Sequence, residues 1–177
     1  MNQFSYFLQD VSRIIGKKKY RLLLVIFTRT FWGLLVYRIE RGNYLIFGRF
    51  YPIIRFPFTP LLMILQSFSN IDIHYKATIK GGMLILHPSV GIVVSGKAII
   101  GKNLTLTGGN VIGLNGNSKN IDFRIGDNCV LGANATIIGP IVLGDHITIG
   151  ASSCVVKNFP ANNVILVGVP AVILNRE

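Results

Sequence analysis

Aliphatic residues recur at every sixth position along most of the chain, and this spacing predicts the fold. The recurrence falls into three runs: Ile73, Ile79 and Ile85; then Val94, Ile100, Leu106 and Ile112; then Ile125, Leu131, Ile137, Leu143, Ile149 and Val155. An amphipathic helix repeats every 3.6 residues and an ordinary strand every two, so neither produces this spacing. A hexapeptide repeat is typical of a parallel β-helix, whose short strands each place one aliphatic side chain inward before the chain turns a corner. The sequence therefore predicts a mainly β fold, a parallel β-helix, over residues 71–177.

Two breaks in the repeat are candidate functional positions. The step after Ile85 is nine residues long instead of six, and the step after Ile112 is thirteen. The first break contains His87 followed by a proline, and the second predicts an extruded polar loop over residues 113–124. Insertions in repeat folds map to loops, and such loops often carry the binding face. Because imidazole titrates near neutral pH, His87 is a candidate general base; the alternative is a histidine that only satisfies the backbone of a bulge.

Residues 1–70 predict a separate, basic and apolar helical region. Ten Lys or Arg side chains stand there against Asp10 and Glu40, which gives +8 of the total charge of +11. We expect short helices separated at Gly42 and at the proline-containing stretch 52–60. Such a segment fits a helix lying on an anionic membrane surface, and the alternative is a helical subdomain packed on the β-helix or used in oligomer contacts. No nucleic-acid-binding motif accompanies the charge, so a nucleic acid partner is not expected.

Other features indicate a cytoplasmic protein at the inner face of the cell membrane. The apolar run 22–37 is interrupted by Arg29, and the run 44–68 by two arginines and three prolines, so neither predicts a clean transmembrane span or a cleavable signal. Cys129 and Cys154 lack a CxxC spacing and are expected to be buried, reduced thiols.

The three histidines show no metal-ligand spacing, so we expect no metal.

Six segments form an ordered series of motifs after residue 70. They are residues 71–74 (Ile-Asp-Ile-His), His87, 91–94 (Gly-Ile-Val-Val), 132–135 (Gly-Ala-Asn-Ala), 149–152 (Ile-Gly-Ala-Ser) and 168–171 (Gly-Val-Pro-Ala). This series resembles serine acetyltransferases and related hexapeptide-repeat acyltransferases. The basic front end is similar to that of acetyltransferases from bacterial capsule, exopolysaccharide or O-antigen gene clusters. The resemblance implies a left-handed β-helix, a homotrimer, and acetyl-CoA bound in the groove between neighbouring subunits.

The resemblance also implies roles for the catalytic residues. His87 corresponds to the general base, and Asp72 to the carboxylate that orients it. An alcohol becomes a competent nucleophile when a positioned imidazole takes its proton, and a carboxylate on the other ring nitrogen fixes the tautomer. Gly113, at the start of the predicted loop, is a candidate donor to the developing oxyanion.

Cofactor positions follow from the same resemblance. Ala133 and Ala151 match small positions that let the pantetheine arm of acetyl-CoA approach the backbone. Lys157 is a candidate partner for the phosphates of coenzyme A, and solvated surface charge is the alternative for this side chain.

The departures from the family pattern bear on the acceptor. Serine acetyltransferases have an aspartate directly before the catalytic histidine, where this chain has Leu86, and a second histidine near the end of the loop, where this chain has Asp122. His74 and Asn115 are further candidate acceptor contacts. The charged ammonium group of serine needs a partner when it is buried, whereas a sugar hydroxyl does not.

The sequence as a whole therefore predicts an acetyl-CoA-dependent O-acetyltransferase that acts on a bacterial polysaccharide or on its lipid-linked sugar precursor. Two alternatives remain open at this stage: a serine O-acetyltransferase, and a non-catalytic β-helix scaffold that has lost the chemistry.

Overall fold

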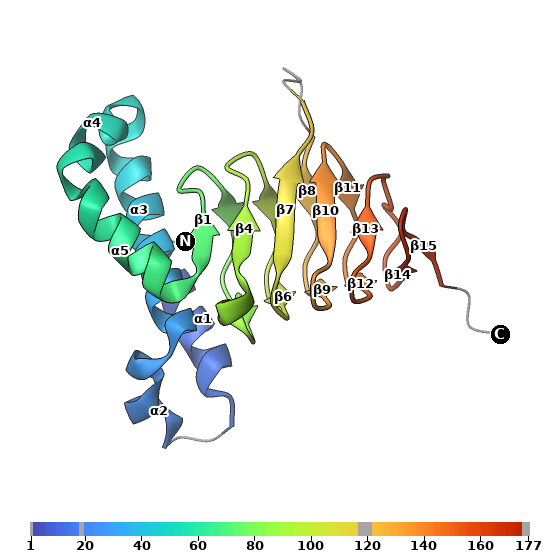
Figure 1. Cartoon of the computed structure of the whole chain (residues 1–177), viewed down its shortest axis with the longest axis horizontal. Helices are drawn as coiled ribbons and strands as arrows, with labels where there is room; N and C mark the ends of the chain where they lie inside the picture. The colour runs from blue at the N-terminus through green and yellow to red at the C-terminus, as the bar shows by residue number, and fades with distance from the viewer. Residues whose placement is uncertain (1, 18–19, 117–121, 175–177) are drawn as a thin grey trace.

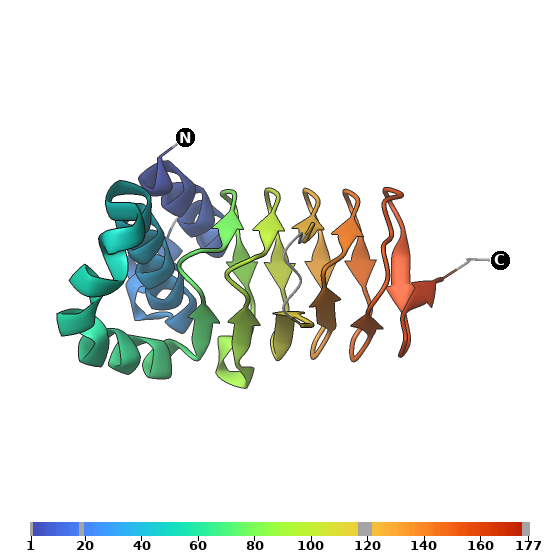
Figure 2. The same ribbon diagram turned by 90° about the horizontal axis from the view of Figure 1, so that it is seen from above.

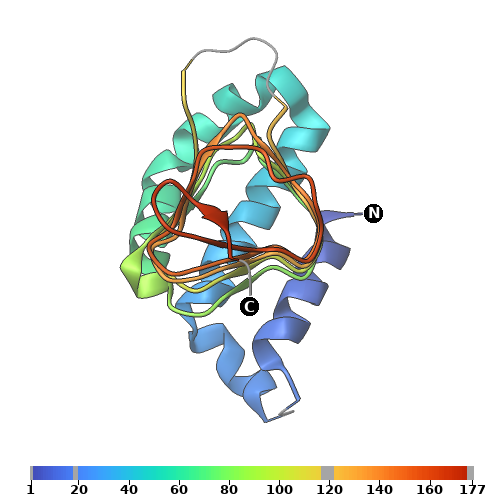
Figure 3. The same cartoon turned by 90° about the vertical axis from the view of Figure 1, so that its right-hand side faces the viewer.

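The computed structural model describes residues 2–17, 20–116 and 122–174, and it confirms the predicted parallel β-helix. Figures 1 and 2 show the coils stacked in one row, with the helices of the first seventy residues covering the end where the β-helix begins. Viewed along the stack, the coils have a triangular outline (Figure 3).

Three sheets form the three faces of this triangle. Sheet A consists of β1 (Ile71–Ile73), β4 (Ile92–Val94), β7 (Asn110–Leu114), β10 (Thr136–Gly139) and β13 (Cys154–Val155). Sheet B consists of β2 (Thr78–Ile79), β5 (Ile99–Ile100), β8 (Arg124–Ile125) and β11 (Val142–Leu143). Sheet C consists of β3 (Leu84–Ile85), β6 (Thr105–Leu106), β9 (Val130–Leu131), β12 (Thr148–Ile149), β14 (Ile165–Val167) and β15 (Val172–Ile173). Neighbouring strands are parallel, except that β15 turns back and pairs antiparallel with β14 at the last coil.

The core contains the residues that the six-residue spacing selects. All thirteen of them, from Ile73 to Val155, are at most 3% exposed. A parallel strand pair brings the same repeat position of successive coils into register, as where Ile79 pairs with Ile100 and Ile100 with Ile125. The inward side chains therefore stack in columns, and this burial stabilises strands only two or three residues long. Cys129 is buried as predicted, whereas Cys154 is only half-buried.

The helices differ in one respect from the sequence expectation. They are α1 (Gln3–Ile15), α2 (Arg21–Leu24), α3 (Arg29–Phe47), α4 (Tyr51–Arg55) and α5 (Thr59–Ser69), with 3-10 turns η1 (Val25–Phe27), η2 (Gly48–Phe50) and η3 (Phe56–Phe58). The predicted break at Gly42 is wrong, because α3 continues through it and ends at Gly48, where φ is +53°. Glycine adopts this positive φ without the steric cost of a β-carbon.

Buried contacts fix the helical region to the first coil. A β-carbon on Gly33 of α3 would lie 2.5 Å from the side chain of Ile71, so the helix packs directly on β1. The carboxylate of Asp10 in α1 pairs with the guanidinium of Arg38 in α3 at 2.8 Å, and both side chains are almost fully buried. Asp10 also accepts a hydrogen bond from the Met83 main-chain N–H (2.7 Å), and Arg38 donates one to the Ile79 carbonyl (2.7 Å). These contacts make α1, α3 and the first coil a single packed unit.

Among the described residues, no single helix is long and apolar enough to cross a membrane. One bent pair, residues 21–27 with 29–69, meets the length and composition required, with a bend of 72° between its parts.

Candidate active site

The nine-residue step forms a bulge at a corner, as the sequence predicts. His87 follows β3 and precedes the 3-10 turn η4 (Pro88–Val90), which occupies the corner between sheet C and sheet A. The main-chain N–H of His87 donates to the Thr107 carbonyl of the next coil at 2.9 Å. The backbone of His87 is therefore held by the coil stack while its imidazole is exposed.

Gly108, Ala133 and Ala151 lie at the same corner of the three following coils, each after a sheet C strand and before a sheet A strand. Main-chain hydrogen bonds connect this series, from Asn134 N–H to the Gly108 carbonyl and from Ser152 N–H to the Ala133 carbonyl, both 2.8 Å. We call this edge, at residues 86–91, 107–109, 132–135 and 150–153, the catalytic edge. The candidate base and the two candidate pantetheine positions thus lie along one line on the molecule.

The buried side chain of Asn110 holds the part of the catalytic edge at residues 107–109 in place. Asn110 is 1% exposed and accepts a hydrogen bond from the Gly108 N–H (2.9 Å) through its side-chain oxygen. Its side-chain nitrogen donates to the carbonyls of Gly132 (2.7 Å) and Ala135 (3.2 Å) in the next coil. Sequence reasoning missed Asn110. The available signal was a polar residue two positions before a core aliphatic, because the neighbouring coils carry the apolar residues Ile92 and Ala135 at the equivalent position.

Asp72 lies on the outer face of sheet A, in the middle of β1, where it pairs in register with Val93. β1 borders the bulge, because the Asn70 side chain donates to the Ser89 carbonyl at 3.3 Å. Within the described residues, no ion pair or hydrogen bond joins Asp72 to His87. Catalytic hydrogen bonds are often open in enzymes without substrate, so the orienting role of Asp72 stays a prediction.

The described ends of the predicted loop lie at the side of sheet A opposite the catalytic edge. The loop was expected to begin at Gly113, but β7 continues through Leu114, so Gly113 belongs to the sheet. Asn115 and Asp122 are exposed beyond that strand, and Asp122 pairs with Arg124 at 2.6 Å. Loop residues 117–121 lie outside the described part of the chain.

His74 and Lys157 lie at this opposite edge, where the chain leaves the sheet A strands. We call it the loop edge and define it as residues 74–77, 95–98, 115–116 and 156–158. The ring of His74 stacks on Tyr75 with 4.5 Å between centroids, and its Nδ1 accepts the Lys76 main-chain N–H at 3.1 Å. Partial burial, and next the charge of Lys76, lower the pKa of His74 below its usual value. The predicted site residues are therefore divided between two edges of the same sheet, with Asp72 and Gly113 on the face between them.

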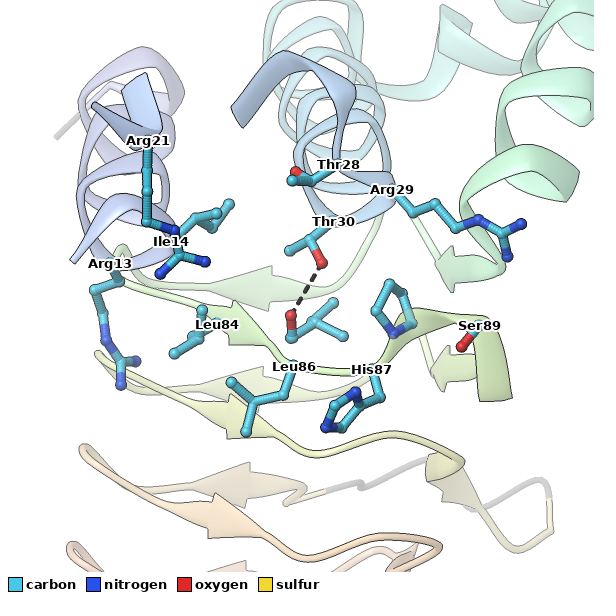
Figure 4. A pocket seen from close by; sticks show the side chains of 12 residues that line it. Arg13, Ile14, Arg21, Thr28, Arg29, Thr30, Leu84, Leu86, His87 and Ser89 are labelled. Atoms are coloured by element: carbon cyan, nitrogen blue, oxygen red, sulfur yellow. Dashed lines mark hydrogen bonds between the residues drawn. The ribbon is translucent and has the colours of Figure 1, made fainter. Parts of the chain in front are cut away.

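A pocket of about 480 Å³ lies beside His87, on the side of the helical region. His87, Leu86 and Ser89 form its β-helix wall, and helical residues including Arg21 and Arg29 form the other wall (Figure 4). The Thr30 hydroxyl bridges the two walls by donating to the Ile85 carbonyl at 2.9 Å. Sequence reasoning placed Leu86 near the acceptor but missed the helical wall, because no local pattern brings residues 13–14, 21 and 28–30 to the bulge.

No group of three or more potential metal-ligating side chains occurs among residues 2–17, 20–116 and 122–174.

A family model and several curated proteins match parts of this chain. A family model described as the hexapeptide repeat of succinyl-transferase matches residues 123–156. A serine acetyltransferase of Staphylococcus epidermidis is 33% identical over 113 residues, which are 63% of this chain and 52% of that protein. A serine acetyltransferase of Staphylococcus aureus is 31% identical over 113 residues, again 63% of this chain and 52% of that protein. The chain thus spans about half the length of the curated relatives it matches.

Solved structures agree with the sequence relatives. The serine acetyltransferase of Neisseria gonorrhoeae has a TM-score of 0.81 and 27% identity, with 98% of this chain and 67% of that chain covered. The serine acetyltransferase of Brucella abortus in complex with coenzyme A has a TM-score of 0.75 and 26% identity, with 96% and 66% covered. This chain is therefore a hexapeptide-repeat β-helix protein that is similar to serine acetyltransferases over both its helical and its β-helical parts.

Proposed function

We propose that this chain is an acetyl-CoA-dependent O-acetyltransferase with His87 as its general base. The observation that carries the proposal is the position of His87 at the head of the catalytic edge, followed along the stack by Gly108, Ala133 and Ala151. Small side chains let an extended ligand approach the backbone, and the similar Brucella abortus structure is one with coenzyme A. Acetyl-CoA, bound along this edge, would supply the acetyl group as a thioester.

The exposed imidazole of His87 would take the proton of the acceptor hydroxyl as the oxygen attacks the thioester carbonyl. A new C–O bond forms, the C–S bond breaks, and the proton passes to the departing thiolate of coenzyme A. Such proton transfer is typically worth about 10²–10⁴-fold in rate. Asp72, on the face that borders the bulge, is proposed to orient the ring once substrates are bound.

The division of the site between two edges of sheet A supports an oligomer, proposed as a homotrimer. In a ring of identical subunits, the catalytic edge of one copy can meet the loop edge of the next, because such an interface uses two different patches. Asn115, Asp122 and Lys157 would then approach the His87 of a neighbouring subunit.

Two acceptors are candidates. The comparisons favour serine, which sequence reasoning placed second, because the similar proteins are named as serine acetyltransferases. A glycan acceptor, which sequence reasoning placed first, is supported by the pocket beside His87. Its lining residues include arginines and no acid, and Leu86 stands where the family carries an aspartate. A bound ammonium group would lack a carboxylate partner there.

A membrane-surface location is proposed for the helical region. Of the 31 large hydrophobic side chains that are exposed in the described part of the chain, 21 lie before residue 70. Asp10 and Glu40, the only acids in this region, are buried and paired with Arg38 and Arg55, so its exposed ionised side chains are cationic. An apolar surface interspersed with Lys and Arg matches a protein seated on an anionic leaflet.

The decisive experiment offers acetyl-CoA with serine and, separately, with sugar acceptors, and follows thiol release and the acetylated product. His87→Ala is expected to lower turnover by about 10²–10⁴-fold while coenzyme A still binds in calorimetry. His146→Ala, on a corner remote in sequence from the bulge, is the matched control and is expected to keep wild-type turnover. Unchanged turnover in His87→Ala refutes the assignment of the base, and absence of coenzyme A binding to the wild type favours the scaffold alternative.

A further inference from the structure

The charged side chains that line the pocket between the helical region and the bulge are all basic. Its lining residues include Arg13, Arg21 and Arg29 and the candidate base His87, and none of them is Asp or Glu. Cations gathered around one cavity without an acid repel one another, and an anionic occupant relieves that repulsion.

The three arginines differ in how far the protein already uses them. Arg13 is committed to the β-helix, because its guanidinium donates to the carbonyls of Gly82 and Leu104 and to the Thr105 hydroxyl. The side chains of Arg21 and Arg29 make no hydrogen bond or ion pair within the described parts of the chain, and the Arg29 guanidinium only lies over the Phe68 ring at 5.9 Å. Their donors remain available to a ligand.

The surroundings suit an acceptor with an anionic group next to its reacting hydroxyl. Figure 4 shows Arg21 and Arg29 on opposite sides of Thr28 and Thr30, with His87, Leu86 and Ser89 across from them. Thr28 caps the amino-terminal end of the 19-residue helix α3, so the positive end of that helix also borders the pocket. The wall near Arg21 is apolar, with Ile14 and Leu84.

We infer that the acceptor carries a phosphate or diphosphate group, which Arg21 and Arg29 bind while the neighbouring sugar hydroxyl is presented to His87. Guanidinium groups match phosphate oxygens with two parallel N–H donors, and this geometry distinguishes them from a lysine ammonium. The inference rests on the proposed acetyl transfer and deepens it by naming the acceptor class. Both a nucleoside-diphosphate sugar and a lipid-linked diphosphate sugar have this chemistry.

Binding of inorganic pyrophosphate to the full chain, measured by calorimetry, tests the pocket without any need for catalysis. We expect saturable binding that the double variant Arg21→Gln/Arg29→Gln weakens at least tenfold. The Arg21→Lys/Arg29→Lys variant should restore only part of it, because lysine keeps the charge and loses the paired donors. Arg49→Gln, an exposed arginine of the helical region that does not line the pocket, is the matched control and should bind like the wild type.

Four outcomes overturn the inference: no pyrophosphate binding, equal binding by the double glutamine variant, equal loss in Arg49→Gln, and displacement of pyrophosphate by coenzyme A. The last outcome would assign the pocket to the cosubstrate. Coenzyme A binding by the double variant keeps a failure here distinguishable from a failure of the proposed function.

Turnover then identifies the source of the phosphate. Acceptors are offered as a sugar, as a nucleoside-diphosphate sugar, and as a polyprenyl-diphosphate sugar in anionic vesicles. We expect the double glutamine variant to raise KM at least tenfold for whichever phosphorylated acceptor reacts, with KM for acetyl-CoA unchanged. Preference for serine or for the unphosphorylated sugar contradicts the inference.

Discussion

A β-carbon at Gly108 would lie 2.6 Å from the carbonyl oxygen of His87 and 3.2 Å from its Cβ. Gly108 also has a φ of +147°. The candidate base is therefore positioned by direct backbone contact with the next coil, at a place where only glycine fits.

Gly108→Ala is expected to displace the bulge that carries His87. Overpacking of this kind costs about 1–3 kcal/mol of unfolding free energy. Because a shift of the base by a fraction of an ångström misaligns proton transfer, we expect kcat to fall by about tenfold to a hundredfold, with KM for acetyl-CoA little changed. Steady-state kinetics and thermal unfolding measure both effects.

Gly48→Ala is the control for Gly108→Ala. Gly48 also has a positive φ, but nothing lies within 4 Å of its added β-carbon. It should show a modest loss of stability and wild-type kcat. Equal kcat in Gly108→Ala and wild type would contradict the positioning role.

Removal of Arg38 should separate the helical region from the first coil. Arg38→Ala leaves the Asp10 carboxylate buried without its partner, and such a change costs about 3–5 kcal/mol. Chemical denaturation should show this loss, whereas Arg49→Ala, an exposed arginine, should change stability by less than about 0.5 kcal/mol. A loss in Arg38→Ala as small as that in Arg49→Ala would mean that the ion pair does not hold the two parts together.

His74 gives a pH dependence of stability with a definite sign. Its folded-state pKa lies below the ordinary value of 6.5, so the neutral ring stabilises the fold fully above pH 6.5. Acidification through the folded pKa removes this contribution, because the partly buried ring then carries a charge beside Lys76 and its protonated Nδ1 no longer accepts the Lys76 N–H. His74→Gln should therefore lose less thermal stability than the wild type between pH 6.5 and pH 5, and His146→Gln should behave like the wild type. If the thermal stability of His74→Gln and of the wild type fell equally between pH 6.5 and pH 5, the stabilising role of the neutral His74 ring would be disproved.

The exposed apolar helices predict binding to anionic vesicles. Ile53 and Phe56 are 73% and 79% exposed in the helical region. A fully buried Ile or Phe side chain contributes about 1.5–3 kcal/mol, so Ile53→Ser/Phe56→Ser should weaken co-sedimentation with phosphatidylglycerol vesicles at least about tenfold. Val156→Ser on the β-helix is the control and should bind as the wild type does. Binding that is insensitive both to the double substitution and to salt would count against a membrane surface.

The periodic part of the sequence predicted the fold well because each coil contacts chiefly its neighbours. Local spacing alone identified the thirteen core aliphatics and the bulge at His87. Gly42 was misread as a helix break because packing of α3 on the first coil outweighs the roughly 1 kcal/mol cost of a glycine within a helix. The helical wall of the pocket was not predictable, since Arg21 and Arg29 line one pocket with bulge residues that lie some sixty positions away in the sequence.

The regular stacking of the catalytic edge also sets a length scale. Neighbouring parallel strands lie about 4.8 Å apart, so the three steps from the His87 corner to the Ala151 corner span about 14 Å. If the pantetheine arm of acetyl-CoA binds along this edge as proposed, the number of coils, and not any single side chain, sets the length of arm that reaches the candidate base His87. Removal of one whole coil would shorten that reach by about 5 Å while every remaining strand kept its partner.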